Sequence, residues 1–117
     1  MRLTAIATAL LLFWPAAAMA DAVGRFDMSG TNPGSDARYN GSVSVERTGK
    51  TFRVVWTIGN ARFVGTGIGD DKFLAVTYRS GNDMGLALYG HEGNGTWVGI
   101  WTYAGGKETG TERWVPR

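Results

Sequence analysis

The sequence has 117 residues, enough for one domain, and its 12 Lys and Arg against 10 Asp and Glu give a net charge of +2 at pH 7. It contains no cysteine, which excludes a disulfide-framework protein, thiol chemistry and metal sites with cysteine ligands. No basic run is visible along the chain, which argues against a nucleic-acid partner.

Residues 1–20 have the pattern of a secretory signal peptide. Arg2 gives a positive start, Leu3–Trp14 is an apolar run, and Ala18-Met19-Ala20 fits a small-x-small cleavage site. The apolar run is too short to read as a membrane span. Removal of this segment lowers the basic count from 12 to 11 against 10 acidic residues. We therefore expect an exported protein, periplasmic or secreted, with residues 21–117 as its folded domain and no further membrane association.

Frequent glycines predict a chain of short strands. The sequence has 18 glycines and three prolines, and the runs between the glycines are rich in Val, Ile, Thr, Trp, Tyr and Phe. No long segment keeps a helical period of 3.6 residues. The expected strands are about Val23–Met28, Arg38–Arg47, Thr51–Ile58, Arg62–Ile68, Phe73–Arg79, Gly85–Tyr89, Thr96–Tyr103 and Thr109–Val115.

Alternation and short connections predict how these strands are arranged. In the second strand Tyr39, Gly41, Val43 and Val45 alternate with polar residues, which gives one buried and one wet face. Only the Ser29–Ala37 connection is long, and short links favour an antiparallel meander. Eight such strands can close and remove their exposed edges, around an interior that is packed or holds one small ligand. We therefore predict an all-β, single-domain meander that forms a small closed or nearly closed β-barrel.

The sixth and seventh strands are apolar on both faces, unlike the second and third. If Ala87 and the tryptophans of the seventh strand point inward, then Leu86, Leu88, Val98 and Ile100 lie outside. An exposed apolar patch is usually a contact site. We expect this face to meet a second copy of the chain, as a homodimer through strands six and seven, or another protein.

Aromatic residues on the inward faces are candidates for ligand binding. In the seventh strand Trp97, Gly99, Trp101 and Tyr103 share one face, so the rings leave a gap at the glycine. Such rings either fill the core or line a pocket for a flat molecule or a sugar. The candidate rings are Trp56, Tyr78, Tyr89, Trp97, Trp101 and Trp114.

Glu112 is the one acidic candidate. It shares a face of the last strand with Trp114, so its carboxylate is expected to point inward. A buried carboxylate needs a partner, and Arg38, Arg62 or Arg79 can supply one as a structural ion pair. The alternative is that Glu112 anchors a ligand.

No other group of residues indicates catalysis. His91, the only histidine, is either a base oriented by Glu92 or a solvent-exposed loop residue. Asp70-Asp71 follows a glycine-rich run, but the dinucleotide pattern needs a helix there and a calcium site needs more ligands, so a tight turn is expected. No pair of acidic residues stands out in the sequence, so glycosidase chemistry has no support. We expect no catalytic residues, no metal and no cofactor.

Glycine and aromatic motifs recur through residues 21–117 and resemble a family of small exported proteins of Gram-negative bacteria, some of which carry the label "fibronectin-binding protein". The resemblance implies a β fold, export and an adhesin-like, protein-binding activity, and it brings no catalytic set. The Trp97-x-Gly99-x-Trp101 strand is also similar to strands of avidin-like and lipocalin-like barrels. The motifs are Tyr39-x-Gly41-x-Val43-x-Val45, Phe52-x-Val54-x-Trp56-x-Ile58-Gly59, Gly65-x-Gly67-Ile68, Leu74-Ala75-Val76-x-Tyr78, Gly85-x-Ala87-x-Tyr89, Trp97-x-Gly99-x-Trp101 and Gly110-Thr111-Glu112.

The leading hypothesis is an exported, non-enzymatic binding or interaction module. Its ligand is either a small apolar or aromatic molecule inside the barrel or a protein on the outer face. An interior cavity on the order of several hundred Å³ favours the small ligand, and a fully packed interior favours the surface. The alternative is an exported inhibitor of a protease or a lysozyme, which needs a projecting loop. Ser29–Ala37 and Gly90–Gly95 are the candidate loops.

Overall fold

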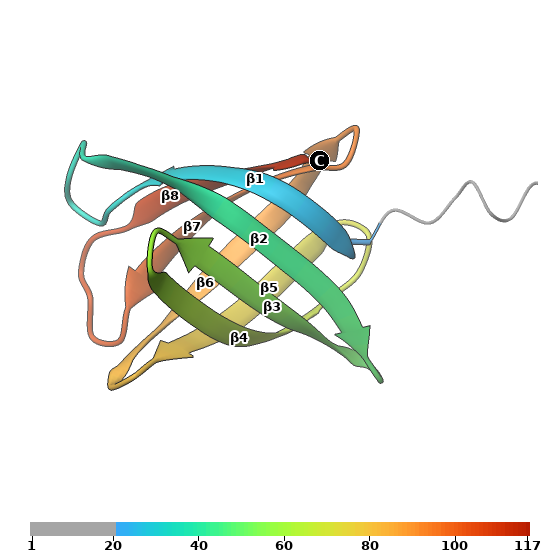
Figure 1. Cartoon of the computed structure of the whole chain (residues 1–117), viewed down its shortest axis with the longest axis horizontal. Helices are drawn as coiled ribbons and strands as arrows, with labels where there is room; N and C mark the ends of the chain where they lie inside the picture. The colour runs from blue at the N-terminus through green and yellow to red at the C-terminus, as the bar shows by residue number, and fades with distance from the viewer. Residues whose placement is uncertain (1–20) are drawn as a thin grey trace, which may run out of the picture.

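The computed structural model describes residues 21–117, and the predicted signal peptide, residues 1–20, lies outside the described residues. Eight antiparallel strands form one closed barrel in which each strand pairs with its neighbour in sequence and β8 pairs with β1 (Figure 1). The predicted all-β meander barrel is confirmed. The strands are β1 (Gly24–Thr31), β2 (Arg38–Thr48), β3 (Thr51–Ile58), β4 (Ala61–Gly69), β5 (Phe73–Ser80), β6 (Asp83–Gly93), β7 (Thr96–Tyr103) and β8 (Gly110–Pro116).

Alternate residues of each strand point into the barrel and form its core. In β3, for example, Phe52, Val54 and Trp56 are buried, as the alternation predicts. The same period holds around the barrel, so all eight strands contribute inward-facing residues to one interior. The buried core residues are Ala22, Phe26, Met28, Val43, Val45, Phe52, Val54, Trp56, Leu74, Val76, Tyr78, Ala87, Tyr89, Trp97 and Trp114.

The first strand is longer than predicted. β1 continues to Thr31, so the connection to β2 is residues 32–37 rather than Ser29–Ala37. Gly30 lies within the predicted Ser29–Ala37 connection, yet it pairs with both neighbouring strands. The first of the two candidate inhibitor loops is therefore shorter than predicted.

The sixth strand is also longer than predicted, running from Asp83 to Gly93 rather than from Gly85 to Tyr89. It reaches β7 through a two-residue turn, Asn94-Gly95, in which both residues have positive φ, 55° and 77°. Asn-Gly is the sequence that such a hairpin turn prefers. The second candidate inhibitor loop is therefore a tight hairpin.

The two ends of the barrel differ. At the end that carries the β2–β3, β4–β5 and β6–β7 turns, Ala22 is fully buried and closes the interior. Arg47 holds this segment, because it forms an ion pair of 3.1 Å with Asp21 and lies 4.4 Å above the centre of the Phe52 ring. At the opposite end lie the β1–β2, β3–β4, β5–β6 and β7–β8 connections (Figure 1). The interior is open toward that end.

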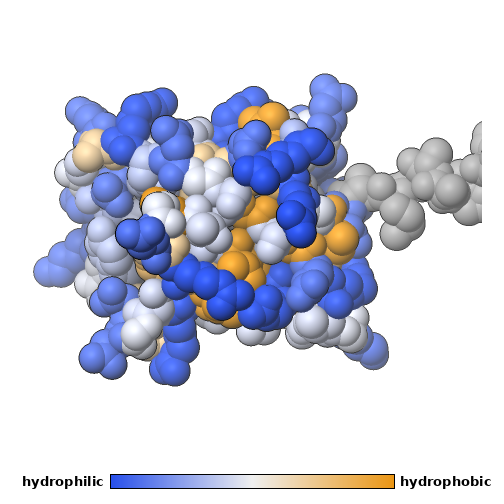
Figure 2. All heavy atoms as spheres, in the orientation of Figure 1, coloured by the Kyte–Doolittle hydropathy of each residue, from blue (hydrophilic) through white to orange (hydrophobic). Residues whose placement is uncertain are grey.

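The outer surface is polar in one region and apolar in another. The face with β1 to β4 in front is mainly hydrophilic toward its edges, with hydrophobic atoms between them (Figure 2). Around β6 and β7, Leu86, Leu88 and Ile100 are each about half exposed, which agrees with the predicted outer apolar patch. Strand pairing extends this patch to Ile68 and Ala75, because Ile68, Ala75, Leu88 and Ile100 form one row across four strands. That a second copy or another protein binds this face remains a prediction.

Candidate functional site

A row of five residues crosses five adjacent strands inside the barrel and centres on Glu112. Tyr89 of β6 pairs with Gly99 of β7, Gly99 pairs with Glu112 of β8, Glu112 pairs with Gly30 of β1, and Gly30 pairs with Tyr39 of β2. The carboxylate therefore has a glycine on each side and a tyrosine beyond each glycine. We call this arrangement the Tyr–Gly–Glu–Gly–Tyr row.

The two glycines make room for the two tyrosine rings. A methyl group on Gly30 would lie 2.6 Å from Cζ and from the hydroxyl of Tyr39. A methyl group on Gly99 would lie 2.5 Å from Cδ1 of Tyr89. Neither distance is possible for a real side chain, because carbon atoms in contact are about 3.5–4.0 Å apart. Each ring thus lies across a glycine and reaches the carboxylate two strands away.

Four aromatic donors bind the buried carboxylate of Glu112. The hydroxyl of Tyr39 donates to Oε2 over 2.6 Å. The other oxygen, Oε1, accepts from the hydroxyl of Tyr89 at 2.7 Å and from the indole N–H groups of Trp114 at 3.0 Å and Trp56 at 3.1 Å. Glu112 is only 7 % exposed. Hydrogen bonds to an ionised acceptor each contribute about 1.5–3 kcal/mol, so this network offsets much of the cost of burying the group.

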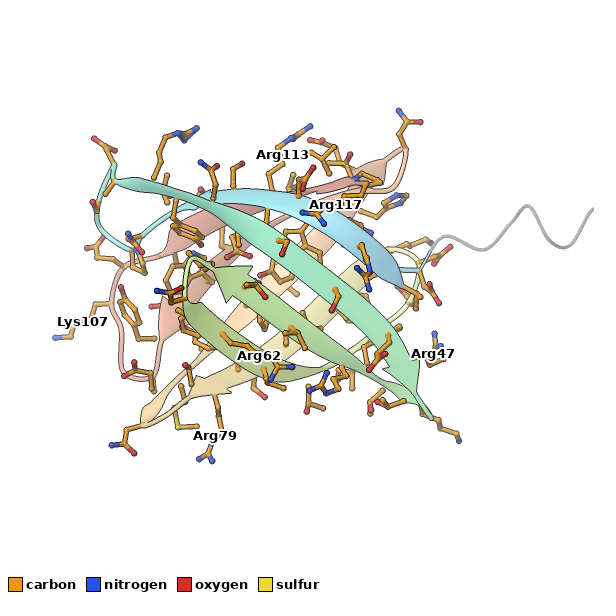
Figure 3. All side chains as sticks on the ribbon, in the orientation of Figure 1. Arg47, Arg62, Arg79, Lys107, Arg113 and Arg117 are labelled. Carbon is orange, nitrogen blue, oxygen red and sulfur yellow. The ribbon has the colours of Figure 1, made fainter. Side chains whose placement is uncertain are left out.

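The predicted arginine partner of Glu112 is wrong. Among residues 21–117, each ion pair lies on the outer surface and involves another carboxylate. Arg38 and Arg62 are exposed, and Figure 3 shows Arg79 pointing away from the barrel. Inward-facing side chains are almost all uncharged here, so the barrel satisfies the carboxylate with neutral N–H and O–H donors. The two oxygens of Glu112 thus accept hydrogen bonds from neutral groups, with no cationic side chain bound to them.

Three tyrosines near this network are held in their neutral form. Burial, together with the negative charge of Glu112, raises the pKa of Tyr39 and of Tyr89 well above the usual value for tyrosine. Burial also raises the pKa of Tyr78 to about 12. All three hydroxyl groups therefore remain protonated donors at physiological pH.

A cavity of about 230 Å³ lies on the open side of Glu112. Asn32 from the β1–β2 connection and Ala61 from the start of β4 contribute to its wall. Glu112 is the one charged residue in the lining, and most of the remaining surface is aromatic or aliphatic. The full lining is Asn32, Tyr39, Trp56, Ile58, Ala61, Phe63, Tyr78, Ala87, Tyr89, Trp101 and Glu112.

The aromatic rings around the cavity pack against one another. Tyr78 makes edge-on contacts with Trp56, Phe63 and Trp101, with ring centres 5.9, 5.9 and 6.2 Å apart. Tyr39 meets Trp101 in the same way at 6.2 Å. The indole N–H of Trp101 donates to the backbone carbonyl of Thr31, which fixes the ring at the wall. The pocket is therefore preformed by packed rings.

The structure divides the predicted ligand-binding residues into two groups. Trp97 and Trp114 are fully buried, do not line the cavity, and fill the interior on its closed side. The rest line the cavity; these are Trp56, Tyr78, Tyr89, Trp101 and Glu112.

Several lining residues were not predicted as site residues. Tyr39 was recognised as inward-facing, but its role depends on the register that brings it across Gly30 to Glu112. Ile58 lines the cavity two residues after Trp56, as the alternation of β3 allows. Phe63 could have been found from the same alternation, since it precedes the inward-facing Gly65 by two residues.

The other candidate residues have structural roles. His91 is a half-buried strand residue, not an exposed loop residue as one reading held, and its ring centre lies 5.0 Å from that of Trp97. Its Nε2 accepts from the backbone N–H of Gly95 at 3.1 Å, which stabilises the hairpin turn. Asp70 accepts from the backbone N–H of Lys72 and of Phe73, so the predicted tight turn is confirmed.

Comparisons with known proteins leave the family open. No protein-family model and no curated protein matches the sequence. The resemblance to exported proteins labelled "fibronectin-binding protein" therefore remains a prediction. In the part of the chain from residue 21 to residue 117, no cluster of three or more acidic or histidine side chains is placed to bind a metal ion. The same residues include no helix of the length and apolarity needed to cross a membrane.

Proposed function

We propose that this chain is an exported, non-enzymatic binding protein that holds one small, largely apolar or aromatic molecule in the cavity beside Glu112. The observation that carries the proposal is the cavity itself, about 230 Å³ inside a barrel whose closed side is filled by large rings. Sites for drug-sized ligands usually measure about 300–1,000 Å³. A ligand with one ring or a short branched body fits this volume.

The chemistry of the wall supports a binding role. Binding sites combine an apolar lining with a few polar groups that set orientation, and here the polar groups are Glu112, Asn32 and the tyrosine hydroxyls. Catalysis needs a base, a nucleophile or a second acid at the site. The described lining contains no histidine and no second carboxylate.

Export is part of the proposal and rests on the signal-peptide pattern of residues 1–20. Intact mass of the protein recovered from its own host tests it. Cleavage after Ala20 gives a chain that begins at Asp21, and recovery of the full-length chain from the cytoplasm would contradict export.

The binding proposal is tested by filling the cavity. Ala87 lies in the lining and is buried, so Ala87→Leu places three additional carbons in the empty space. Ala75→Leu makes the same change on the outside of the neighbouring strand and serves as the matched control. A third variant, Ala61→Trp, closes the mouth from an exposed position.

Native mass spectrometry of protein purified from its host reads out the bound molecule. We expect a small co-purifying mass on the wild type and on Ala75→Leu, and its loss from Ala87→Leu and Ala61→Trp with the barrel intact by circular dichroism. If the wild type carries no small molecule and no compound from an aromatic fragment library changes its tryptophan fluorescence, the proposal is wrong. Equal binding by Ala87→Leu and Ala75→Leu would also contradict it.

A further inference from the structure

We infer that the pocket selects a small organic cation, a protonated primary or secondary amine on an apolar or aromatic body, whose charge is neutralised by Glu112. This inference rests on the proposed function and goes further by assigning the ligand class. It follows from three features of the site: an uncompensated buried charge, an unused acceptor position and an aromatic wall.

The first feature is the charge. Glu112 is 7 % exposed and receives hydrogen bonds only from neutral groups, two tyrosine hydroxyls and two indole N–H groups. Such donors stabilise the carboxylate but leave the net charge of the interior at −1. The raised pKa values of Tyr39 and Tyr89, to which the charge of Glu112 contributes, are consistent with this negative potential. A cation entering the pocket gains Coulomb energy in surroundings of low dielectric constant, where attraction is stronger than in water.

The second feature is the unequal use of the two carboxylate oxygens. Oε1 accepts three hydrogen bonds, whereas Oε2 accepts only one, from Tyr39. Each oxygen of an ionised carboxylate has two lone pairs and can accept at least two hydrogen bonds, and Oε1 shares its lone pairs among three donors. Oε2 therefore has one position left, and Glu112 belongs to the cavity wall. An ammonium N–H is the donor that gives a charge-assisted bond there.

The third feature is the wall. Six aromatic side chains surround the cavity, and aromatic rings carry partial negative charge on their faces. No arginine, lysine or histidine lies among the lining residues that the structure describes. Anions are therefore repelled by Glu112 without any compensating group, and a neutral ligand leaves the carboxylate charge unbalanced. The rings are Tyr39, Trp56, Phe63, Tyr78, Tyr89 and Trp101.

Three probes of one shape and different charge test the inference. Benzylammonium, benzyl alcohol and benzoate carry charges of +1, 0 and −1 on the same benzyl or benzoyl body. Titration of the full folded domain is followed by isothermal calorimetry and by the fluorescence of the pocket tryptophans. We expect benzylammonium to bind at least about tenfold more tightly than benzyl alcohol, a difference typical of one charge-assisted hydrogen bond. We expect benzoate not to bind.

Glu112→Gln removes the charge and retains most of the hydrogen bonds. The amide oxygen can take the place of Oε1 with its three donors, and the amide N–H₂ then faces Tyr39, whose hydroxyl can accept. The matched control is Glu92→Gln, which removes an exposed carboxylate paired with Arg113 at 2.9 Å outside the barrel. We expect Glu112→Gln to lose the preference for benzylammonium and Glu92→Gln to keep it.

The outcomes separate this inference from the proposed function. Equal affinity of the wild type for benzylammonium and benzyl alcohol, or a preference that survives in folded Glu112→Gln, overturns the cation assignment and leaves an apolar pocket. If none of the three probes binds, the cation assignment is wrong and native mass spectrometry alone decides the proposed function. The wild-type comparison needs no variant, so the inference is testable even if Glu112→Gln does not fold.

Discussion

Gly99→Ala is expected to disrupt the Tyr–Gly–Glu–Gly–Tyr row, although glycine has no side chain that could take part in it, because the added methyl group displaces a neighbouring ring. The added methyl carbon would lie 2.5 Å from Cδ1 and 2.9 Å from Cγ of Tyr89, and it would also contact the backbone carbonyl of Leu88. Carbon atoms in contact need about 3.5 Å, so the ring of Tyr89 has to move by about 1 Å. Such a shift breaks the 2.7 Å hydrogen bond from Tyr89 to Glu112.

Two costs add in this variant. Forcing extra atoms into a packed interior costs about 1–3 kcal/mol. Loss of a hydrogen bond to an ionised group costs about 1.5–3 kcal/mol. The free energy of unfolding should therefore fall by about 2.5–6 kcal/mol, a large part of the about 5–15 kcal/mol that stabilises an ordinary domain.

Gly90→Ala is the matched control, because Gly90 lies one residue beyond Tyr89 and its only near atom is the carbonyl oxygen of Lys72 at 3.9 Å. Its stability should stay within about 0.5 kcal/mol of the wild type. Urea unfolding followed by tryptophan fluorescence gives both values from the midpoint at constant slope. If Gly99→Ala does not fold, Tyr89→Phe isolates the hydrogen bond, with an expected loss of about 1.5–3 kcal/mol. A Gly99→Ala protein as stable as Gly90→Ala would refute the packing argument.

Two further predictions concern pH and the outer surface. Because burial raises the pKa of Tyr78 to about 12 and the pKa values of Tyr39 and Tyr89 further, the unfolded chain loses these protons at lower pH than the folded barrel. The contribution of these tyrosines to the free energy of unfolding is thus complete below pH 10, the ordinary tyrosine pKa, and falls above it by at most about 1.4 kcal/mol per pH unit for each tyrosine. Phenolate absorbance should appear for these residues only with unfolding. Their titration in a folded barrel near the ordinary pKa would contradict their burial. If the outer face of β6 and β7 joins two copies, sedimentation velocity should show a dimer that becomes a monomer in the Leu88→Lys, Ile100→Lys double variant, whereas a wild-type protein that stays monomeric at high concentration excludes this dimer.

Alternation in the sequence was sufficient to predict the strands, the inward face and the closed barrel. It was also sufficient to predict that Glu112 points inward, since only the period of two within β8 is needed. The hydrogen-bond donors of Glu112 could not be predicted from the alternation of side chains. Tyr39, Trp56 and Tyr89 lie on three other strands, and their approach depends on strand register and on ring orientation.

The structural role of individual glycines was difficult to predict from the sequence. Gly49 and Gly59 lie in turns between strands and have positive φ, 65° and 60°. Gly30 and Gly99 have a different role, because they lie within strands and leave space for a tyrosine from the adjacent strand. A glycine in the linear sequence does not reveal which of these two roles it has. The cavity was equally hidden, since its volume depends on how the packed rings fill the barrel.

The position of Glu112 also has a consequence for the order of folding. Its partners Tyr39 and Trp56 are 73 and 56 residues earlier in the chain, and the β1–β8 seam beside it joins threonines 80 residues apart. Contacts this distant form late, because long loops must be closed before they contribute. Without β8 the other seven strands have no closed arrangement, and Tyr39, Tyr89 and Trp56 lack their acceptor. β8 both carries the carboxylate and closes the sheet, so we expect the cavity beside Glu112 and the finished barrel to appear together.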